Sequence, residues 1–149
     1  MGCDIHIYAE AKINGLWTPI GSVFTSKHYE YESSGDKEKE IVYLGVAEPY
    51  EGRNYRLFSI LADVRGEGPA IIDCRGFPKD ASDFVKKEYD GLGYDAHSAH
   101  YYFLNELIEN KNRFEICNEF LQTINDLSGL ADMYNINYQD VRVVFWFDN

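Results

Sequence analysis

The segment VRVVFWFDN at residues 141–149 constrains the fold more than any other part of the chain. Side chains alternate between the two faces of a β-strand, so this segment would present two different apolar faces. One face would carry Val141, Val143, Phe145 and Phe147, and the other Arg142, Val144, Trp146 and Asp148. Strands this apolar are normally central and covered on both sides. The segment therefore predicts a strand in the middle of a sheet.

The opening segment, MGCDIHIYAE, alternates in the same way. Its apolar face holds Cys3, Ile5, Ile7 and Ala9, and its polar face holds Asp4, His6, Tyr8 and Glu10. Asn14-Gly15 predicts a tight hairpin turn, because both residues tolerate a positive φ. A return strand is expected over residues 16–24, then a polar loop or hairpin tip over 25–40 and another strand over 41–46.

Helices are expected between these strands. Apolar residues at helical spacing predict helices over residues 54–64, with Asn54 as the N-cap, and from Phe114 to Ala131. A short helix capped by Asp80 and a helix capped by Asp95 or Ser98 are also expected. The fold class is therefore α+β. We expect a mostly antiparallel sheet in which the two terminal strands are neighbours, within a single domain spanning residues 1–149.

Charge and cysteine content restrict the partners. The formal net charge is −11, which disfavours duplex nucleic acid and anionic membranes. No apolar run approaches the ~18 residues of a membrane span, and no secretory signal is visible. Three widely spaced cysteines, Cys3, Cys74 and Cys117, favour a reducing, cytoplasmic location. Cys74 is the cysteine with an activating neighbour, Arg75.

The first candidate site is Asp4-Ile5-His6. Alternation places Asp4 and His6 on one face, roughly 7 Å apart along the strand. At that spacing they could share a metal or frame a ligand. The alternative is an Asp that satisfies a His at the edge of the core.

The second candidate is Asp95-Ala96-His97-Ser98, at the expected start of a helix. Free N–H groups and the helix dipole favour an anion there. The alternative is a capping sequence with an exposed His97. His100 lies one helical turn further on and is more simply an exposed helical histidine.

Arg75 and Trp146 complete the candidates. Arg75, before Gly76, could clamp a phosphate or carboxylate bidentately, or pair with one of the many acids. The indole of Trp146 could stack on a ligand ring, or pack in the core.

Several motifs occur together and in order: MGCDIH, RNYRLFSILADVRG, CRGFPKDAS, DAHSAHYYFLNEL and VRVVFWFDN. In this the chain resembles, over most of its length, a family of small bacteriophage and bacterial proteins that begin Met-Gly-Cys-Asp-Ile-His. The family pattern matches Arg75-Gly76 through Asp80 and Ser82, and Asp95, His97 and Ser98. His100 stands where members often have a second serine. The resemblance implies a site at these positions but no particular reaction.

The predicted function is binding of a small anionic, nucleotide-like ligand, and a phage counter-defence role follows by analogy only. The ligand-binding residues would be Asp4, His6, Arg75, Asp95, His97, Ser98 and Trp146. The alternative is a hydrolase in which Asp4, His6, Asp95 and His97 hold a divalent metal and its bound water. A third interpretation is a structural or protein-interaction module, so whether the chain is an enzyme stays open. The sequence leaves the oligomeric state and any cofactor undefined.

Overall fold

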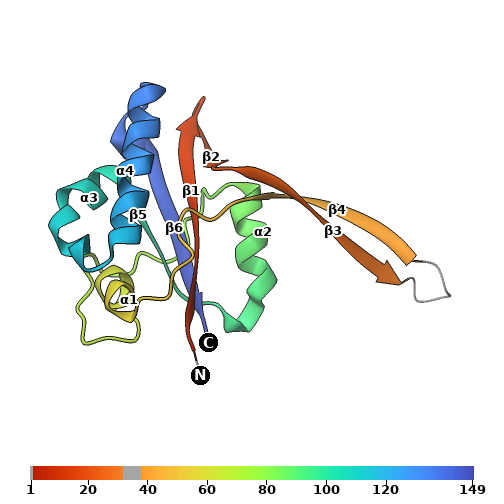
Figure 1. Ribbon diagram of the computed structural model, residues 1–149, viewed down its shortest axis with the longest axis horizontal. Coiled ribbons are helices and arrows are strands. Elements are labelled where there is room, and N and C mark those ends of the chain that lie inside the picture. The colour runs from red at the N-terminus through yellow and green to blue at the C-terminus, as the bar shows by residue number, and fades with distance from the viewer. Residues whose placement is uncertain (1, 32–37) are drawn as a thin grey trace.

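The computed structural model describes residues 2–31 and 38–149. Four strands form one antiparallel sheet in the order β2-β1-β6-β5. Their bounds are β1 (Asp4–Ile13), β2 (Leu16–Ile20), β5 (His97–Phe103) and β6 (Val141–Asp148). The two terminal strands lie side by side at the centre of the sheet, as the sequence predicts (Figure 1).

The register of β1 and β6 places Asp4 opposite Asp148 and Ala11 opposite Val141. Asn14 and Gly15 connect β1 to β2 with positive φ angles of 52° and 80°, which confirms the predicted tight turn. Pro19 lies on β2, which is an edge strand. An edge strand tolerates proline because the missing N–H removes no hydrogen bond from the centre of the sheet.

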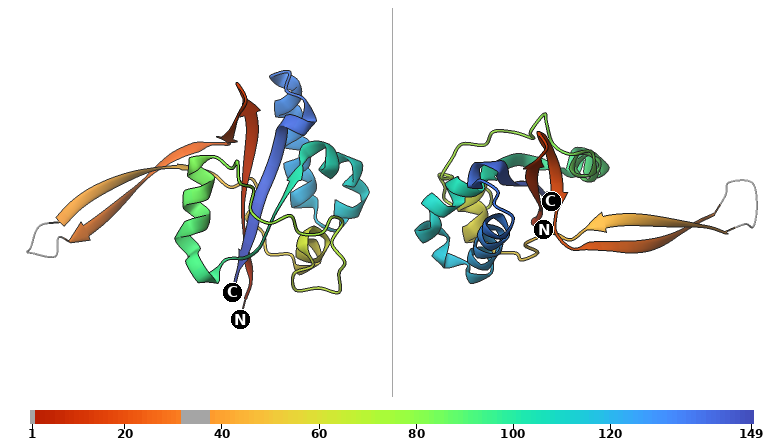
Figure 2. Two further views of the ribbon diagram at one scale, coloured as in Figure 1. Left: turned by 180° about the vertical axis from the view of Figure 1, so that it is seen from behind. Right: turned by 90° about the horizontal axis from the view of Figure 1, so that it is seen from above.

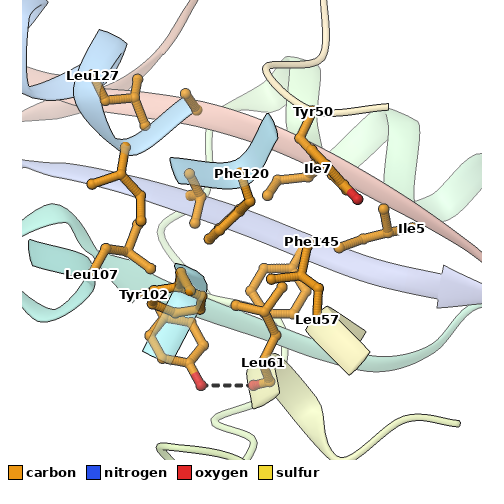
Figure 3. Close-up of a cluster of buried hydrophobic side chains, with 14 of the residues drawn as sticks. Ile5, Ile7, Tyr50, Leu57, Leu61, Tyr102, Leu107, Phe120, Leu127 and Phe145 are labelled. Atoms are coloured by element: carbon orange, nitrogen blue, oxygen red, sulfur yellow. Dashed lines mark hydrogen bonds between the residues drawn. The ribbon is translucent and has the colours of Figure 1, made fainter. Parts of the chain in front are cut away.

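Three helices cover one face of this sheet: α1 (Tyr55–Ala62), α3 (Leu104–Glu109) and α4 (Asn118–Met133). The odd-numbered residues of β1 and β6 point into this layer and form the main core with Leu57, Leu107 and Phe120. Figure 3 shows part of this core, where the Tyr102 hydroxyl donates to the Leu61 carbonyl at 2.7 Å. This bond satisfies the polar tip of a fully buried tyrosine.

The opposite face is covered by α2 (Asp83–Leu92) and the segment that leads into it (Figure 2). Tyr8, Val85, Val144 and Trp146 are the main members of this second apolar cluster. The sheet is thus covered on both faces, which explains why β6 is apolar on both sides. Short 3₁₀ helices complete the body: η1 (Gly93–Asp95), η2 (Lys111–Ile116) and η3 (Tyr138–Asp140).

The strands β3 (Val23–Tyr31) and β4 (Glu38–Val46) form a separate two-stranded sheet that extends away from the body as an arm (Figures 1 and 2). The expected strand over 16–24 therefore ends at Ile20, and most of the expected loop over 25–40 is strand. The hairpin tip expected within that loop falls partly on residues 32–37, which lie outside the described residues. At the base of the arm, Ala47 N–H donates to the Ser22 carbonyl at 2.8 Å.

The predicted N-cap of α1 is confirmed, because the Asn54 side chain accepts the Leu57 N–H. The predicted cap at Asp80 was wrong, because Ser82 caps α2 and Asp80 binds Arg142 instead. The helix expected after Asp95 or Ser98 was also wrong, because residues 97–103 form β5 and the helix begins at Leu104. Within the described residues, no helix is long and apolar enough to cross a membrane.

Candidate functional site

The even-numbered side chains of β1 and β6 form a polar and aromatic stripe on the α2 face of the sheet. In register, His6 lies opposite Trp146 and Glu10 lies opposite Arg142. The stripe follows from the alternation of the two strands, since an apolar odd face leaves the even face for polar groups. It contains three of the predicted site residues: Asp4, His6 and Trp146.

His6 and Asp148 form a hydrogen-bonded pair, with His6 Nε2 2.7 Å from Asp148 Oδ2. This bond lowers the pKa of Asp148, helped by the Asp4 N–H that reaches its other oxygen. Because the carboxylate is ionised, Nε2 of His6 is the donor. In neutral His6 the other ring nitrogen, Nδ1, is then a hydrogen-bond acceptor. The imidazole lies nearly parallel to the indole of Trp146, with ring centroids 6.2 Å apart.

A cavity of about 380 Å³ opens between this pair and α2. We call it the α2 pocket; it is lined by His6, Tyr8, Lys87, Glu88, Gly91, Leu92 and Trp146. Its aromatic wall comes from Tyr8 and Trp146, whose ring centroids are 5.9 Å apart. Within the described structure the indole Nε1 of Trp146 is buried without a hydrogen-bond partner. A buried donor of this kind normally has a hydrogen-bond partner.

Two carboxylates lie near Tyr8, and one of them, Glu88, lines the pocket. The Tyr8 hydroxyl donates to Glu88 Oε2 at 3.5 Å, and Glu48 accepts the Ile7 N–H at 2.9 Å. Burial raises the pKa of Tyr8, and the nearby charges of Glu48 and Glu88 raise it further. Burial also raises the pKa of Glu48. Tyr8 is therefore a neutral hydroxyl in this site and not a nucleophile.

Asp4 does not join His6 in holding a common group. Its carboxylate pairs with Arg53, at 2.7 Å from Nη2. The side chain of Asp4 is about half exposed, so this ion pair lies at the surface. The predicted strand is confirmed, but each member of the Asp4–His6 pair has its own partner.

Arg75 lies away from the α2 pocket. Its two terminal nitrogens bind the two carboxylate oxygens of Glu106, at 2.8 Å and 2.5 Å. The guanidinium also covers the rings of Tyr101 and Phe103 near the end of β5. Arg75 therefore does bind a carboxylate bidentately, as predicted, but that carboxylate is the side chain of Glu106 and not a ligand.

The other predicted anion-binding residues lie at the beginning of β5. His97 stacks on Phe147, on the main-core face of the sheet, and its Nδ1 is 3.1 Å from Ser98 Oγ. Asp95 is exposed on η1. His97 therefore lies at the beginning of β5, whereas the Arg75 guanidinium lies against Tyr101 and Phe103 near its end, and the structure does not bring the two to one pocket wall. No helix begins at 95–98, so the dipole argument for an anion there is wrong.

The metal-binding alternative requires several ligand side chains close together. Across residues 2–31 and 38–149, no three His, Cys, Asp or Glu side chains gather closely enough to hold an ion. The four residues of the metal alternative, Asp4, His6, Asp95 and His97, accordingly do not converge. Cys74 is a poor nucleophile despite its neighbour Arg75, because burial and two nearby aspartates raise its thiol pKa.

Sequence analysis did not predict two polar clusters, and the first is centred on His100. His100 is fully buried: its Nδ1 accepts the Arg75 N–H at 3.1 Å, and its Nε2 donates to the Ile72 carbonyl at 2.9 Å. It ties the loop before α2 to β5 and is not an exposed helical residue.

The second missed cluster is an ion-pair network centred on Arg142. Arg142 Nε donates to Glu10 Oε1 at 2.8 Å and Nη1 donates to Asp80 Oδ1 at 2.9 Å, while Glu10 also accepts the Ser82 N–H. Glu10 and Arg142 are both almost completely buried. Glu10 and Arg142 carry opposite charges and face each other in the register of β1 and β6. Once the two terminal strands are aligned as antiparallel neighbours, the sequence could have predicted this ion pair. The network anchors the N-cap of α2 and so fixes the wall of the α2 pocket.

Comparisons of the chain with protein-family models, with curated proteins and with solved structures find no significant match. The resemblance to the Met-Gly-Cys-Asp-Ile-His proteins therefore stays a prediction.

Proposed function

We propose that the protein binds a small, flat, polar molecule of the nucleoside or nucleotide class in the α2 pocket. The observation that carries this proposal is a cavity whose lining combines an aromatic wall with the His6 imidazole, which Asp148 holds in place. A volume of about 380 Å³ lies within the range of small-molecule sites, which is about 300–1,000 Å³.

The polar groups of the pocket suit a heteroaromatic ring. His6 Nδ1 accepts a hydrogen bond when the ring is neutral, and the Glu88 carboxylate accepts as well. A base carries donors and acceptors on its edge and a π-face for the aromatic wall. Lys87 is the cationic lining residue and would contact a phosphate group. Because Glu88 stands beside it, we expect ring recognition to contribute more than the phosphate.

Gly91 allows a sharp test. It lies on α2, it lines the pocket, and a Cβ added there meets no atom within 4 Å. Gly91→Phe should therefore fill the pocket without straining the fold, and an added side chain favours the helix. Gly129→Phe is the matched control, because Gly129 lies in α4 with equally open surroundings and does not line the α2 pocket.

Calorimetry with adenosine, guanosine and their monophosphates should detect binding to the parent protein. Gly91→Phe should weaken that binding at least tenfold, and Gly129→Phe should leave it unchanged. The absence of binding to the parent below about 1 mM would contradict the proposal, as would unchanged binding to Gly91→Phe.

A second cavity, of about 390 Å³, lies beside α1 and is lined by Arg56 and Arg65. It supplies the control for the phosphate group. If a monophosphate binds more tightly than its nucleoside, Lys87→Gln should remove that gain and Arg56→Gln should not. The reverse result would place the anion beside α1 and contradict the site proposed for it.

A further inference from the structure

Glu88 brings a carboxylate to the lining of the α2 pocket. The side chain extends from α2, and its Oε2 accepts the Tyr8 hydroxyl at 3.5 Å. The Tyr8 ring is itself held between two aromatic neighbours, because its centroid lies 5.4 Å from that of Phe84 and 5.9 Å from that of Trp146. The hydrogen bond therefore ties the carboxylate to the aromatic wall of the pocket.

The polar groups around this wall are mainly acceptors. A carboxylate can only accept hydrogen bonds, and its two oxygens together offer about four lone-pair positions. The Tyr8 hydroxyl uses one of them, so Glu88 has room for further donors. His6 adds an acceptor, since its Nε2 donates to Asp148 and Nδ1 of the neutral ring carries a lone pair. The lining therefore favours a ring whose edge is rich in N–H donors.

Nucleobases differ in which donors lie next to each other on the ring edge. Guanine has its N1–H beside the 2-amino group, so two parallel N–H bonds match the two oxygens of a carboxylate. Adenine and cytosine each place an amino group beside an unprotonated ring nitrogen, and the lone pair of that nitrogen would face the second oxygen. Uracil has one N–H flanked by two carbonyl oxygens. A carboxylate thus distinguishes guanine from the other three bases.

We propose that the α2 pocket selects guanine, and that Glu88 determines this specificity by accepting the N1–H and the 2-amino group together. This inference rests on the proposed function, because it names the base within the nucleoside class. With any other base one carboxylate oxygen loses its donor. A site built to hydrogen-bond a ligand group discriminates strongly against analogues that lack the group, since its own polar atoms are then left unpaired.

Calorimetry of the parent protein with guanosine, inosine and adenosine tests the base preference. Guanosine should bind at least tenfold more tightly than adenosine, which is within the range for a bidentate contact to a base. Inosine lacks the 2-amino group but keeps the N1–H, so its affinity should lie between the two. Adenosine binding as tightly as guanosine would overturn this inference and leave the nucleoside site standing. No binding of any nucleoside would contradict both proposals.

Glu88→Gln tests the residue itself. The glutamine amide offers one acceptor and one donor, a pair that suits the 6-amino group and N1 of adenine and not the two donors of guanine. The ratio of guanosine affinity to adenosine affinity should therefore fall at least tenfold. Glu88 is exposed, so the variant should fold as the parent does, and a calorimetric melt checks this. An unchanged ratio in the folded variant would overturn the role of Glu88.

Asp90→Asn is the matched control. Asp90 lies on the same helix, is exposed like Glu88 and is not among the lining residues of the α2 pocket. Its substitution changes the net charge by the same amount, so it separates recognition of the base from general electrostatics. The affinity ratio should stay as in the parent protein. An equal fall of the ratio in both variants would overturn direct recognition by Glu88.

Pterins carry the same 2-amino-4-oxo edge as guanine, so pterin is the last probe. Guanosine should bind more tightly than pterin, because the proposed ligand includes a ribose and, in a nucleotide, a phosphate beside Lys87. Tighter binding of pterin than of guanosine would overturn the assignment to guanine.

Discussion

At the scale of single residues, the structure assigns His100 a structural role with a pH signature. Burial lowers its pKa from the ordinary value of 6.5, although the bond to the Ile72 carbonyl acts in the opposite direction. The unfolded chain takes up a proton on this side chain as pH falls through about 6.5, whereas the folded chain does so only at lower pH. The unfolded state therefore binds more protons in that window, and the free energy of unfolding falls as pH drops through it.

His100→Gln should reduce this pH dependence. The glutamine amide can donate to the Ile72 carbonyl and accept the Arg75 N–H, but it does not titrate. Thermal melts at pH 7.5 and 5.0 should show a smaller loss of melting temperature in the variant than in the parent. Equal losses in the two proteins would mean that His100 titrates alike in the folded and unfolded chains.

At the scale of elements, alternation was sufficient to predict β1 and β6 and their pairing, since each strand has a strict period of two. It failed for β5. Ser98 adopts a positive φ of 54°, and the register shifts between His97 and His100, so the bulge interrupts the period. The apolar residues from Phe103 to Ile108 do have helical spacing, and that spacing was extended too far toward the N-terminus. Pairing with β6, and the preference of aromatic residues for strands, decided the structure of residues 97–103.

The buried network between β1, β6 and α2 gives a prediction at this scale. Glu10→Gln should lower the free energy of unfolding by about 3–5 kcal/mol, because it leaves the buried Arg142 without its charged partner. The double variant Glu10→Leu/Arg142→Met should recover most of that loss, since it leaves no buried charge unpaired. Urea titrations of the single and double variants measure both effects. A double variant less stable than Glu10→Gln would show that the network contributes more than charge compensation.

At the scale of the whole molecule, the sequence could locate part of the candidate site. His6 and Trp146 were predicted because they belong to strands whose faces can be read from alternation. Lys87, Glu88 and Gly91 were not, because nothing in a polar helical segment shows which sheet face it will cover. Arg75 was expected to face a ligand, but it binds Glu106. The loop that carries Arg75 past the edge of β5 brings the two side chains together. Contacts made by such loops depend on tertiary packing, which local patterns do not encode.

The described side chains of the arm belong to neither apolar cluster of the body, so the body should fold without it. The Ser22 carbonyl already accepts the Ala47 N–H at 2.8 Å, so the two ends of the arm are adjacent. Replacing residues 23–46 by two glycines should shift the free energy of unfolding by less than about 1 kcal/mol, or roughly 3 °C in Tm. Deleting residues 143–149 is the contrasting control and should abolish folding, because it removes the centre of the sheet. Calorimetric melts of both proteins decide the matter: a shortened-arm protein without a cooperative transition would show that the arm is part of the folding unit.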